Sequence, residues 1–268
     1  AYEIYQCDWS SDVCSSDLNT DGAIDIGTTN NVIGGAGIVL NGGSLTLVMQ
    51  TTGDSVRFNG AVTLSSDVIL DTDSSDANSQ GGAITFTNDA PIDSQTGEHN
   101  TLAIDAGTSV ITFNENIGEA QSLGRFVINE ADAGVIFGGA DNETIGTGST
   151  GPVNVLNTDE DIDIGLDTNV VSGAGIVFNG GANPLSIQTT GDRVRLNGSV
   201  TLRSAVVIDT DASDDNAQGG EILFTNDAPI DSESNEHNDL ALDAGTNAIN
   251  FNEDIGAATL TSSIGNFT

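Results

Sequence analysis

The sequence predicts an all-β fold, a parallel β-helix or β-solenoid built from two tandem 138-residue repeats. Residues 19–120 return as residues 157–258, offset by 138 positions without a gap, and roughly two thirds of the aligned positions are identical. Duplication at this fidelity is typical of arrays made by copying a structural unit. Short apolar and polar alternations have the period of a β-strand, and no segment sustains the period of an amphipathic helix.

The alternations predict which side chains point inward. They recur through both copies, and the largest inward residues are expected to be Phe58, Phe86, Phe113, Leu196, Phe224 and Phe251. Gly, Asn, Asp, Ser and Thr separate the runs, which is typical of turns between strands. The one helical element we expect is a short turn near Ala120–Leu123.

A finer recurrence lies inside the first copy. A short apolar strand followed by Asn or Gly begins at residues 38, 56, 84, 111 and 135, with spacings of 18, 28, 27 and 24 residues. These spacings predict coils of 18 to 28 residues, stacked ~4.8 Å apart. Asn at the corners is expected to hydrogen-bond between coils, and Gly to supply positive φ there.

A second all-β fold remains open, with each 138-residue unit forming its own β-sandwich domain. Short alternating strands with frequent turns fit that architecture as well. The solenoid is favoured by the internal recurrence, and the sandwich by a unit length close to that of a domain.

Residues 1–18 differ from the rest of the chain. They hold both cysteines, the single Trp and both tyrosines, and they lack the basic start and apolar core of a signal peptide. The segment resembles a translated sequencing adapter, so we treat residues 1–18 as a non-native adapter-derived segment. Residues 19–156 are then the first repeat and residues 157–268 a truncated second repeat, and we expect native sequence to extend beyond both ends.

The charge balance excludes several partners. The formal net charge is −35, there is no lysine, and removing the four acids of residues 1–18 still leaves −31. Such a surface repels nucleic acid and anionic membranes. No apolar run approaches the ~18 residues that span a bilayer, so we expect no membrane insertion within this segment.

Several strings carry a resemblance to a known class of proteins. Residues 83–88 (AITFTN), 102–108 (LAIDAGT) and 110–118 (VITFNENIG) resemble repeats of large secreted bacterial adhesins, of the filamentous-haemagglutinin-like and autotransporter type. The resemblance covers both copies. It implies secretion, a right-handed parallel β-helix and a role in adhesion or surface coating.

One repeated loop has the composition of a calcium site. Alternating Asp and Asn side chains precede a Gly-Gly pair in both copies, and hard oxygen ligands on a loop suit Ca²⁺. The spacing is neither that of an EF-hand nor that of a calcium β-roll, and a solvated acidic turn is the alternative. The candidate ligands are Asp71, Asp73, Asp76 and Asn78, with copies Asp209, Asp211, Asp214 and Asn216.

Catalytic patterns are weak. His99 and His237 occupy equivalent polar turns in Glu-His-Asn strings, which indicates a structural role. The acids Asp159, Glu160, Asp161 and Asp163 are expected to form a solvated edge. Aligned Arg57 and Arg195 are expected to point outward beside acids.

The sequence therefore predicts a non-enzymatic structural or adhesive segment of a bacterial cell-surface protein, located outside the cell. Its partner would be a host or environmental surface, a glycan or a matrix, and end-to-end self-association is a further possibility. A calcium-dependent carbohydrate-binding module is the alternative, and a β-helical polysaccharide-cleaving enzyme is a weaker one.

Overall fold

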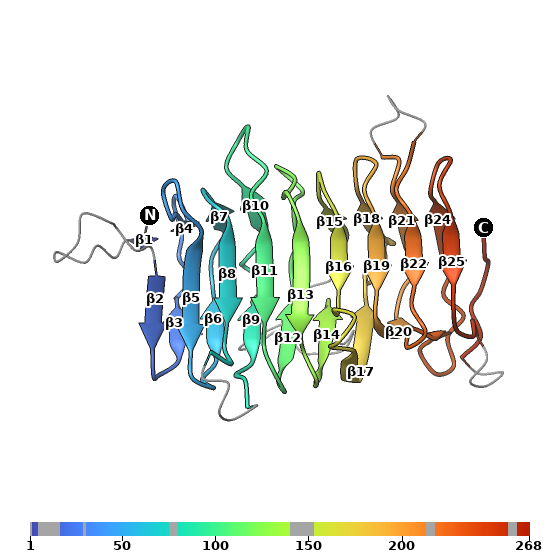
Figure 1. The fold of residues 1–268 in the computed structure, drawn as a ribbon, viewed down its shortest axis with the longest axis horizontal. Helices are drawn as coiled ribbons and strands as arrows, with labels where there is room; N and C mark the ends of the chain where they lie inside the picture. Colours follow the sequence, from blue (N-terminus) through green and yellow to red (C-terminus); the bar gives the residue numbers. More distant parts are fainter. Residues whose placement is uncertain are drawn as a thin grey trace.

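The fold is a parallel β-solenoid with three faces (Figure 1). The computed structural model describes residues 2–4, 17–28, 31–74, 80–139, 153–212, 218–256 and 262–268. Consecutive strands fall on faces A, B and C in turn, so three strands make one coil, except between β12 and β13, where Ile117 takes the place of a strand on face A. All pairings between named strands are parallel, which excludes a pair of antiparallel sandwiches.

The strands of each face follow in stacking order. Face A holds β1 (Tyr2–Ile4), β4 (Ile38–Leu40), β7 (Val62–Leu64), β10 (Ile92–Ser94), β15 (Val155–Asn157), β18 (Leu185–Gln188), β21 (Val206–Asp209) and β24 (Leu240–Asp243). Face B holds β2 (Asp17–Thr20), β5 (Leu47–Thr51), β8 (Val68–Asp71), β11 (Leu102–Asp105), β13 (Phe126–Glu130), β16 (Ile162–Ile164), β19 (Val194–Leu196), β22 (Ile222–Phe224) and β25 (Ile249–Phe251). Face C holds β3 (Ile24–Ile26), β6 (Val56–Phe58), β9 (Ile84–Phe86), β12 (Val110–Phe113), β14 (Gly134–Phe137), β17 (Val171–Phe178), β20 (Gly198–Leu202) and β23 (Ile230–Ser232).

The two copies form one continuous body. Face B runs without interruption from β2 to β25, and face A is completed where Ile117 bridges to Ile92 on one side and Leu156 on the other. Buried residues of both copies belong to a single hydrophobic cluster. The second copy therefore continues the core of the first.

Inward aromatic side chains form a row inside face C. Phe58 stacks on Phe86 with ring centroids 4.8 Å apart, Phe86 on Phe113 at 5.2 Å, and Phe113 on Phe137 at 5.1 Å. Each stacked pair adds about 0.5–1.5 kcal/mol beyond the area it buries. Register is strict because a slip of one residue would turn every inward side chain outward.

Asparagine side chains link neighbouring coils at the corners, as the sequence predicts. Asn59 Nδ2 donates to the carbonyl oxygen of Thr28 at 2.6 Å, and Asn114 Nδ2 donates to that of Phe86 at 3.0 Å. Both side chains are almost fully buried. The acceptors are main-chain oxygens of the adjacent coil, which ties each corner to the one before it.

Three expectations need correction. The spacings of 28, 27 and 24 residues are true coils on face C, but the 18-residue spacing joins Ile38 on face A to Val56 on face C. Coils range from 21 residues, between Leu47 and Val68, to 41 residues, between Val135 and Ile176. No helix forms at 120–123 within the described residues, and Phe251 is only half-buried because no described strand pairs with the outer edge of β25.

Strand β2 begins inside the adapter-like segment. It pairs with β5, and Leu18 packs against the core at the position that Leu156 occupies in the second copy. Farther upstream, β1 pairs with β4.

Equivalent strands of the two copies lie on different faces. Strand β15 repeats β2 but lies on face A instead of B, β16 repeats β3 on face B instead of C, and β17 repeats β4 on face C instead of A. The same shift holds for each later pair through β12 and β25. The aromatic row moves with it, since Phe224 stacks on Phe251 at 5.1 Å on face B.

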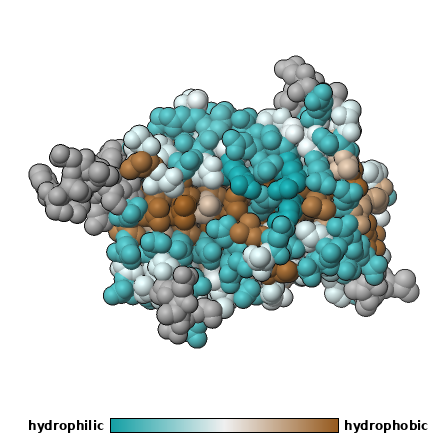
Figure 2. Space-filling model, in the orientation of Figure 1, coloured by the Kyte–Doolittle hydropathy of each residue, from teal (hydrophilic) through white to brown (hydrophobic). Residues whose placement is uncertain are grey.

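Outward residues consequently differ along one face. On face B the register aligns Val48, Ile69, Ala103 and Val127 in a row across β5, β8, β11 and β13. The next residues of the row are Asp163 and Arg195. An apolar band crosses the visible surface and is interrupted by hydrophilic residues near its middle (Figure 2).

Candidate functional site

The described part of the acidic loop is held at its base by hydrogen bonds. Asp71 Oδ1 accepts from the Asp73 amide at 2.9 Å, and Asp71 Oδ2 accepts from Gln50 Nε2 at 3.0 Å. Asp209 Oδ1 accepts from the Asp211 amide at the same 2.9 Å. The other four proposed ligands, Asp76, Asn78, Asp214 and Asn216, lie outside the described residues.

The Gly-Gly pair has a packing reason. A Cβ on Gly81 would overlap the carbonyl oxygen of Ala106, and one on Gly82 would overlap that of Asp54. Thr72 Oγ1 closes the loop by donating to the Gly82 carbonyl at 2.7 Å, and Thr210 does the same to Gly220. These glycines are explained by the close approach of coils, so they are not evidence for calcium.

Acids stack at the end of face B in the first copy. The register places Asp71 beside Asp105, and Asp105 beside Glu130. Burial raises the pKa of the Glu130 carboxyl, and the charges of Asp105, Asp132 and Asp73 raise it further. In the part of the chain that the structure describes, no three His, Cys, Asp or Glu side chains converge as a metal site.

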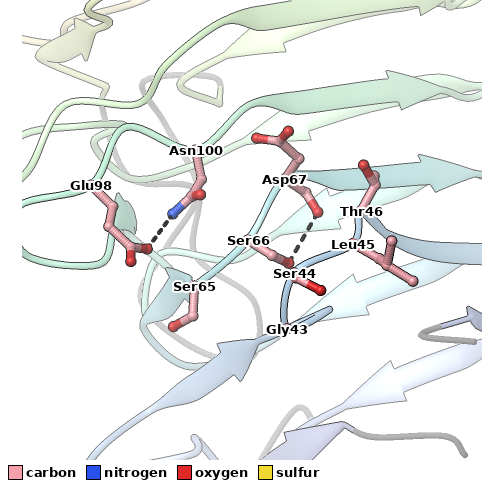
Figure 3. Close-up of a pocket in the computed structure, with 9 residues that line it drawn as sticks. All are labelled: Gly43, Ser44, Leu45, Thr46, Ser65, Ser66, Asp67, Glu98 and Asn100. Carbon is pink, nitrogen blue, oxygen red and sulfur yellow. Dashed lines mark hydrogen bonds between the residues drawn. The ribbon is translucent and has the colours of Figure 1, made fainter. Parts of the chain in front are cut away.

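A polar pocket lies on the edge between faces A and B (Figure 3). It has a volume of about 270 Å³ and is formed by the turns that follow β4, β7 and β10. Its lining residues are Gly43, Ser44, Leu45, Thr46, Ser65, Ser66, Asp67, Glu98 and Asn100. Two carboxylates and several hydroxyls give it the chemistry to bind hydroxyl groups or a cation.

Two of the retained pocket residues, Ser66 and Asn100, hold the turns together. Ser66 Oγ accepts from the Gly42 amide at 2.7 Å, and Asn100 Nδ2 donates to the Leu64 carbonyl at 2.8 Å. Ser204 and Asn238 make the same two bonds in the second copy. Gly43 and Glu98 are also retained, as Gly181 and Glu236. The other five positions vary: Ser44, Leu45, Thr46, Ser65 and Asp67 correspond to Ala182, Asn183, Pro184, Arg203 and Ala205.

The sequence alone does not reveal this pocket, because its residues come from three separate turns. One feature of the sequence does mark the pocket: the two copies diverge there, and five of the nine lining positions differ between them. The fold tolerates either set, so the first set is not dictated by the turns themselves.

The two histidines lie in exposed turns, as expected, but each has a serine neighbour. His99 Nδ1 is 3.0 Å from Ser122 Oγ, and His237 Nδ1 is 3.1 Å from Ser263 Oγ. The serine therefore contacts Nδ1, the nitrogen that an acid would occupy in a catalytic triad. The pairing links adjacent coils.

Asp163 is not part of a solvated edge, which corrects the sequence-based expectation. Its side chain is 2 % exposed and lies between two arginines, with Arg193 Nη2 at 2.8 Å and Arg125 on the other oxygen. Arg125 lies between the two duplicated stretches, residues 19–120 and 157–258. A comparison of the copies therefore could not reveal that Arg125 pairs with Asp163. Arg57 and Arg195 do pair with acids, Asp25 and Asp167 respectively.

Comparison with protein-family models, curated proteins and solved structures finds no match to the chain. Across the described ranges, no helix is both long and apolar enough to span a lipid bilayer.

Proposed function

We propose that the chain is a structural and adhesive repeat segment of a large secreted bacterial cell-surface protein, and that it is not an enzyme. The observation that carries this proposal is the junction between the copies. The second copy continues the sheets and core of the first, so added repeats lengthen a rod rather than add separate domains.

The surface chemistry supports an uncharged, hydroxyl-rich partner such as a glycan or a polysaccharide matrix. A formal charge of −35 repels polyanions. The exposed corners present hydroxyl, amide and carboxylate groups, which hydrogen-bond to sugar hydroxyls. Residues 19–268 contain no Trp or Tyr, so binding would be polar and weak at each site and strong only through many sites.

The pocket between faces A and B favours one second candidate, a calcium-dependent carbohydrate-binding module. Asp67 and Glu98 supply carboxylates, and Ser44, Thr46 and Ser65 supply hydroxyls beside them. In that case sugar binding would depend on calcium and would be confined to the first copy.

Retention on polysaccharide beads tests both candidates. The full chain should be retained on cross-linked dextran, which is neutral, and not on heparin, which is anionic. The Ser65→Arg/Asp67→Ala variant carries residues that the second copy already tolerates, so it should fold normally. Calcium-dependent retention that this variant abolishes would favour the binding module, and no retention on dextran would contradict the adhesive proposal. Release of reducing ends from the dextran would contradict the non-enzymatic part.

A further inference from the structure

The repeat is not a whole number of turns. Between β2 and its copy β15 the chain crosses twelve strands, β3 to β14, and the Ile117 position on face A. Strand β15 is therefore the fourteenth position after β2. Fourteen positions on three faces make four and two-thirds turns, which places the second copy one face away from the first.

Each copy carries the same polar turn, which we name tip 1 (residues 94–100) and tip 2 (residues 232–238). The Asn100 amide donates to Ser94 Oγ at 2.8 Å, and the Asn238 amide donates to Ser232 Oγ at 2.8 Å. Asn235 even adopts a φ of 71° where tip 1 has Gly97, a conformation that Asn accepts better than most residues. The tips are thus the same structure presented twice.

The two tips lie on different edges of the solenoid. Tip 1 connects β10 to β11, on the edge between faces A and B, and tip 2 connects β23 to β24, on the edge between faces C and A. Fourteen thirds of a coil at ~4.8 Å per coil separate them by about 22 Å along the axis.

We propose that the repeat acts as a screw element that turns its adhesive tip by one edge per copy. The proposal rests on the adhesive function above and specifies the partner's arrangement. If the tips of all copies lay on one edge of the solenoid, they would suit a row of binding sites on a flat surface. Copies that face successive edges suit polysaccharide chains that surround the rod, as in a hydrated matrix. Both tips present Glu and His side chains suited to hydroxyl groups: Glu98, His99 and His237 are exposed and Glu236 is partly exposed.

The packing explains why the rotation is tolerated. Strands on all three faces share the same pattern of buried and partly exposed residues, as in β7 on face A, β8 on face B and β9 on face C. A strand can therefore lie on any face if its inward residues meet a neighbour of suitable size. The aromatic row illustrates this, because it lies on face C in the first copy and on face B in the second.

Spin-label distances test the rotation. After Cys7→Ser and Cys14→Ser, labels are placed by Thr96→Cys with either Ser234→Cys or Thr246→Cys, all at exposed positions. Position 246 follows β24, five full turns after position 96 and on the same edge, about 24 Å away at ~4.8 Å per coil. Position 234 is nearer to position 96 along the axis but lies on another edge, so the width of the solenoid adds to the distance between the two labels.

The order of the two distances decides the result. The 96–246 pair should give the shorter distance and the 96–234 pair the longer one. The reverse order would overturn the screw arrangement, because it would place both tips on one edge. If the two distances have the expected order but the protein does not bind dextran, the adhesive function alone would be contradicted.

Co-occupancy by a bulky probe provides a second readout. Biotin replaces the spin labels, and monovalent streptavidin is counted on each molecule by mass photometry. A globular probe of about 500 residues has a radius of gyration of about 23 Å, so two probes on one edge exclude each other. The 96–234 protein should carry two probes and the 96–246 protein mainly one. One probe on both proteins would contradict display on different edges.

Discussion

The two copies of the repeat make nearly the same contacts on different faces of the solenoid. Thr72 and Thr210 close their loops at the same 2.7 Å, and the asparagines of the two tips make matching bonds. Nevertheless, the loop closed by Thr72 connects faces B and C, whereas the loop closed by Thr210 connects faces A and B. The residues of a coil thus determine its corners and which of its side chains point inward. The face on which a strand lies is instead determined by the number of strand positions in the repeat, which is fourteen and not a multiple of three.

The largest expected difference between the copies concerns the burial of equivalent aromatic residues. Phe113 is fully buried and stacks on Phe86 and Phe137, whereas its counterpart Phe251 is half-buried. Phe113→Ala should lower the free energy of unfolding by about 3–5 kcal/mol, and Phe251→Ala by much less. Urea denaturation of the two variants measures the difference. Equal losses would show that both rings are equally covered.

The ion pairs give the next largest expected contrast. Asp163 is buried between Arg125 and Arg193, whereas its counterpart Asp25 is 51 % exposed and pairs with Arg57. Asp163→Asn should cost about 2 kcal/mol, less than the loss of a fully buried pair because both arginines reach solvent. Asp25→Asn should cost about 0–1 kcal/mol. Thermal melts of both variants check this, and a larger loss for Asp25→Asn would contradict the assigned burial.

Calcium should affect both copies to a small and similar degree. A loop site with a Kd of about 10⁻⁴–10⁻³ M would add about 1 kcal/mol at millimolar calcium. We therefore expect a modest rise in melting temperature, larger than with sodium chloride at equal ionic strength. The Asp73→Ala/Asp211→Ala variant should lose this rise, and each single variant should lose part of it. An identical response in wild type and double variant would mean that the loops are solvated turns.

Mild acid should reveal a difference between Asp192 and its counterpart Asp54 in how each contributes to the pH dependence of stability. Burial raises the pKa of Asp192, and the charges of Asp161, Glu160 and Asp159 raise it further. A raised pKa means that the folded state binds the proton more tightly, so stability should increase as pH falls from 7 towards about 4.

Asp192→Asn should weaken this pH dependence. Asp54→Asn serves as the control, because the positions equivalent to 159–161 hold one acid, Asp21, instead of three. Melting temperatures at pH 7 and pH 5 test the pair of variants. A pH dependence that changes equally in both would contradict the effect of the neighbouring acids.

The smallest effect is expected at the N-terminal end. Removal of residues 1–16 should change the melting temperature by less than about 2 °C, because the described part of this segment is β1, a three-residue strand at the end of face A whose one described partner strand is β4. Removal of residues 1–18 should cost more, since it also deletes Leu18 from the edge of the core. A large loss from the shorter deletion would show that the pairing of β1 with β4 contributes substantially to stability.

Much of the fold could be predicted because inward alternation is local. Phe58, Phe86, Phe113, Leu196 and Phe224 are buried as expected, and three of the four spacings are true coils. The face of each strand could not be predicted, since loops of different length connect faces without altering the alternation. Leu45 alternates with Leu47 and Met49 in the sequence but lies in a turn and is 51 % exposed.

The candidate sites were harder to predict. Asp71 and Asp73 do lie together at the base of one loop, as their sequence proximity suggests. The pocket around Asp67 and Glu98 and the burial of Asp163 depend on contacts between coils 24 to 38 residues apart, for example Ser66 with Gly42 and Asp163 with Arg125. Sequence spacing carries no direct sign of such contacts.

The stacking of the coils also determines how the protein responds to a pull. The first and last described strands, β1 and β25, lie at opposite ends of the solenoid (Figure 1), so tension along the axis acts on the terminal coils first. A coil that detaches replaces ~4.8 Å of solenoid with up to about 90 Å of extended chain, for a coil of 27 residues such as the one from Ile84 to Ile111. Because each coil contacts only its neighbours, detachment proceeds one coil at a time. A short rod of this kind dissipates a sudden load through successive steps of extension, while the coils farther from the end stay folded and available to rewind.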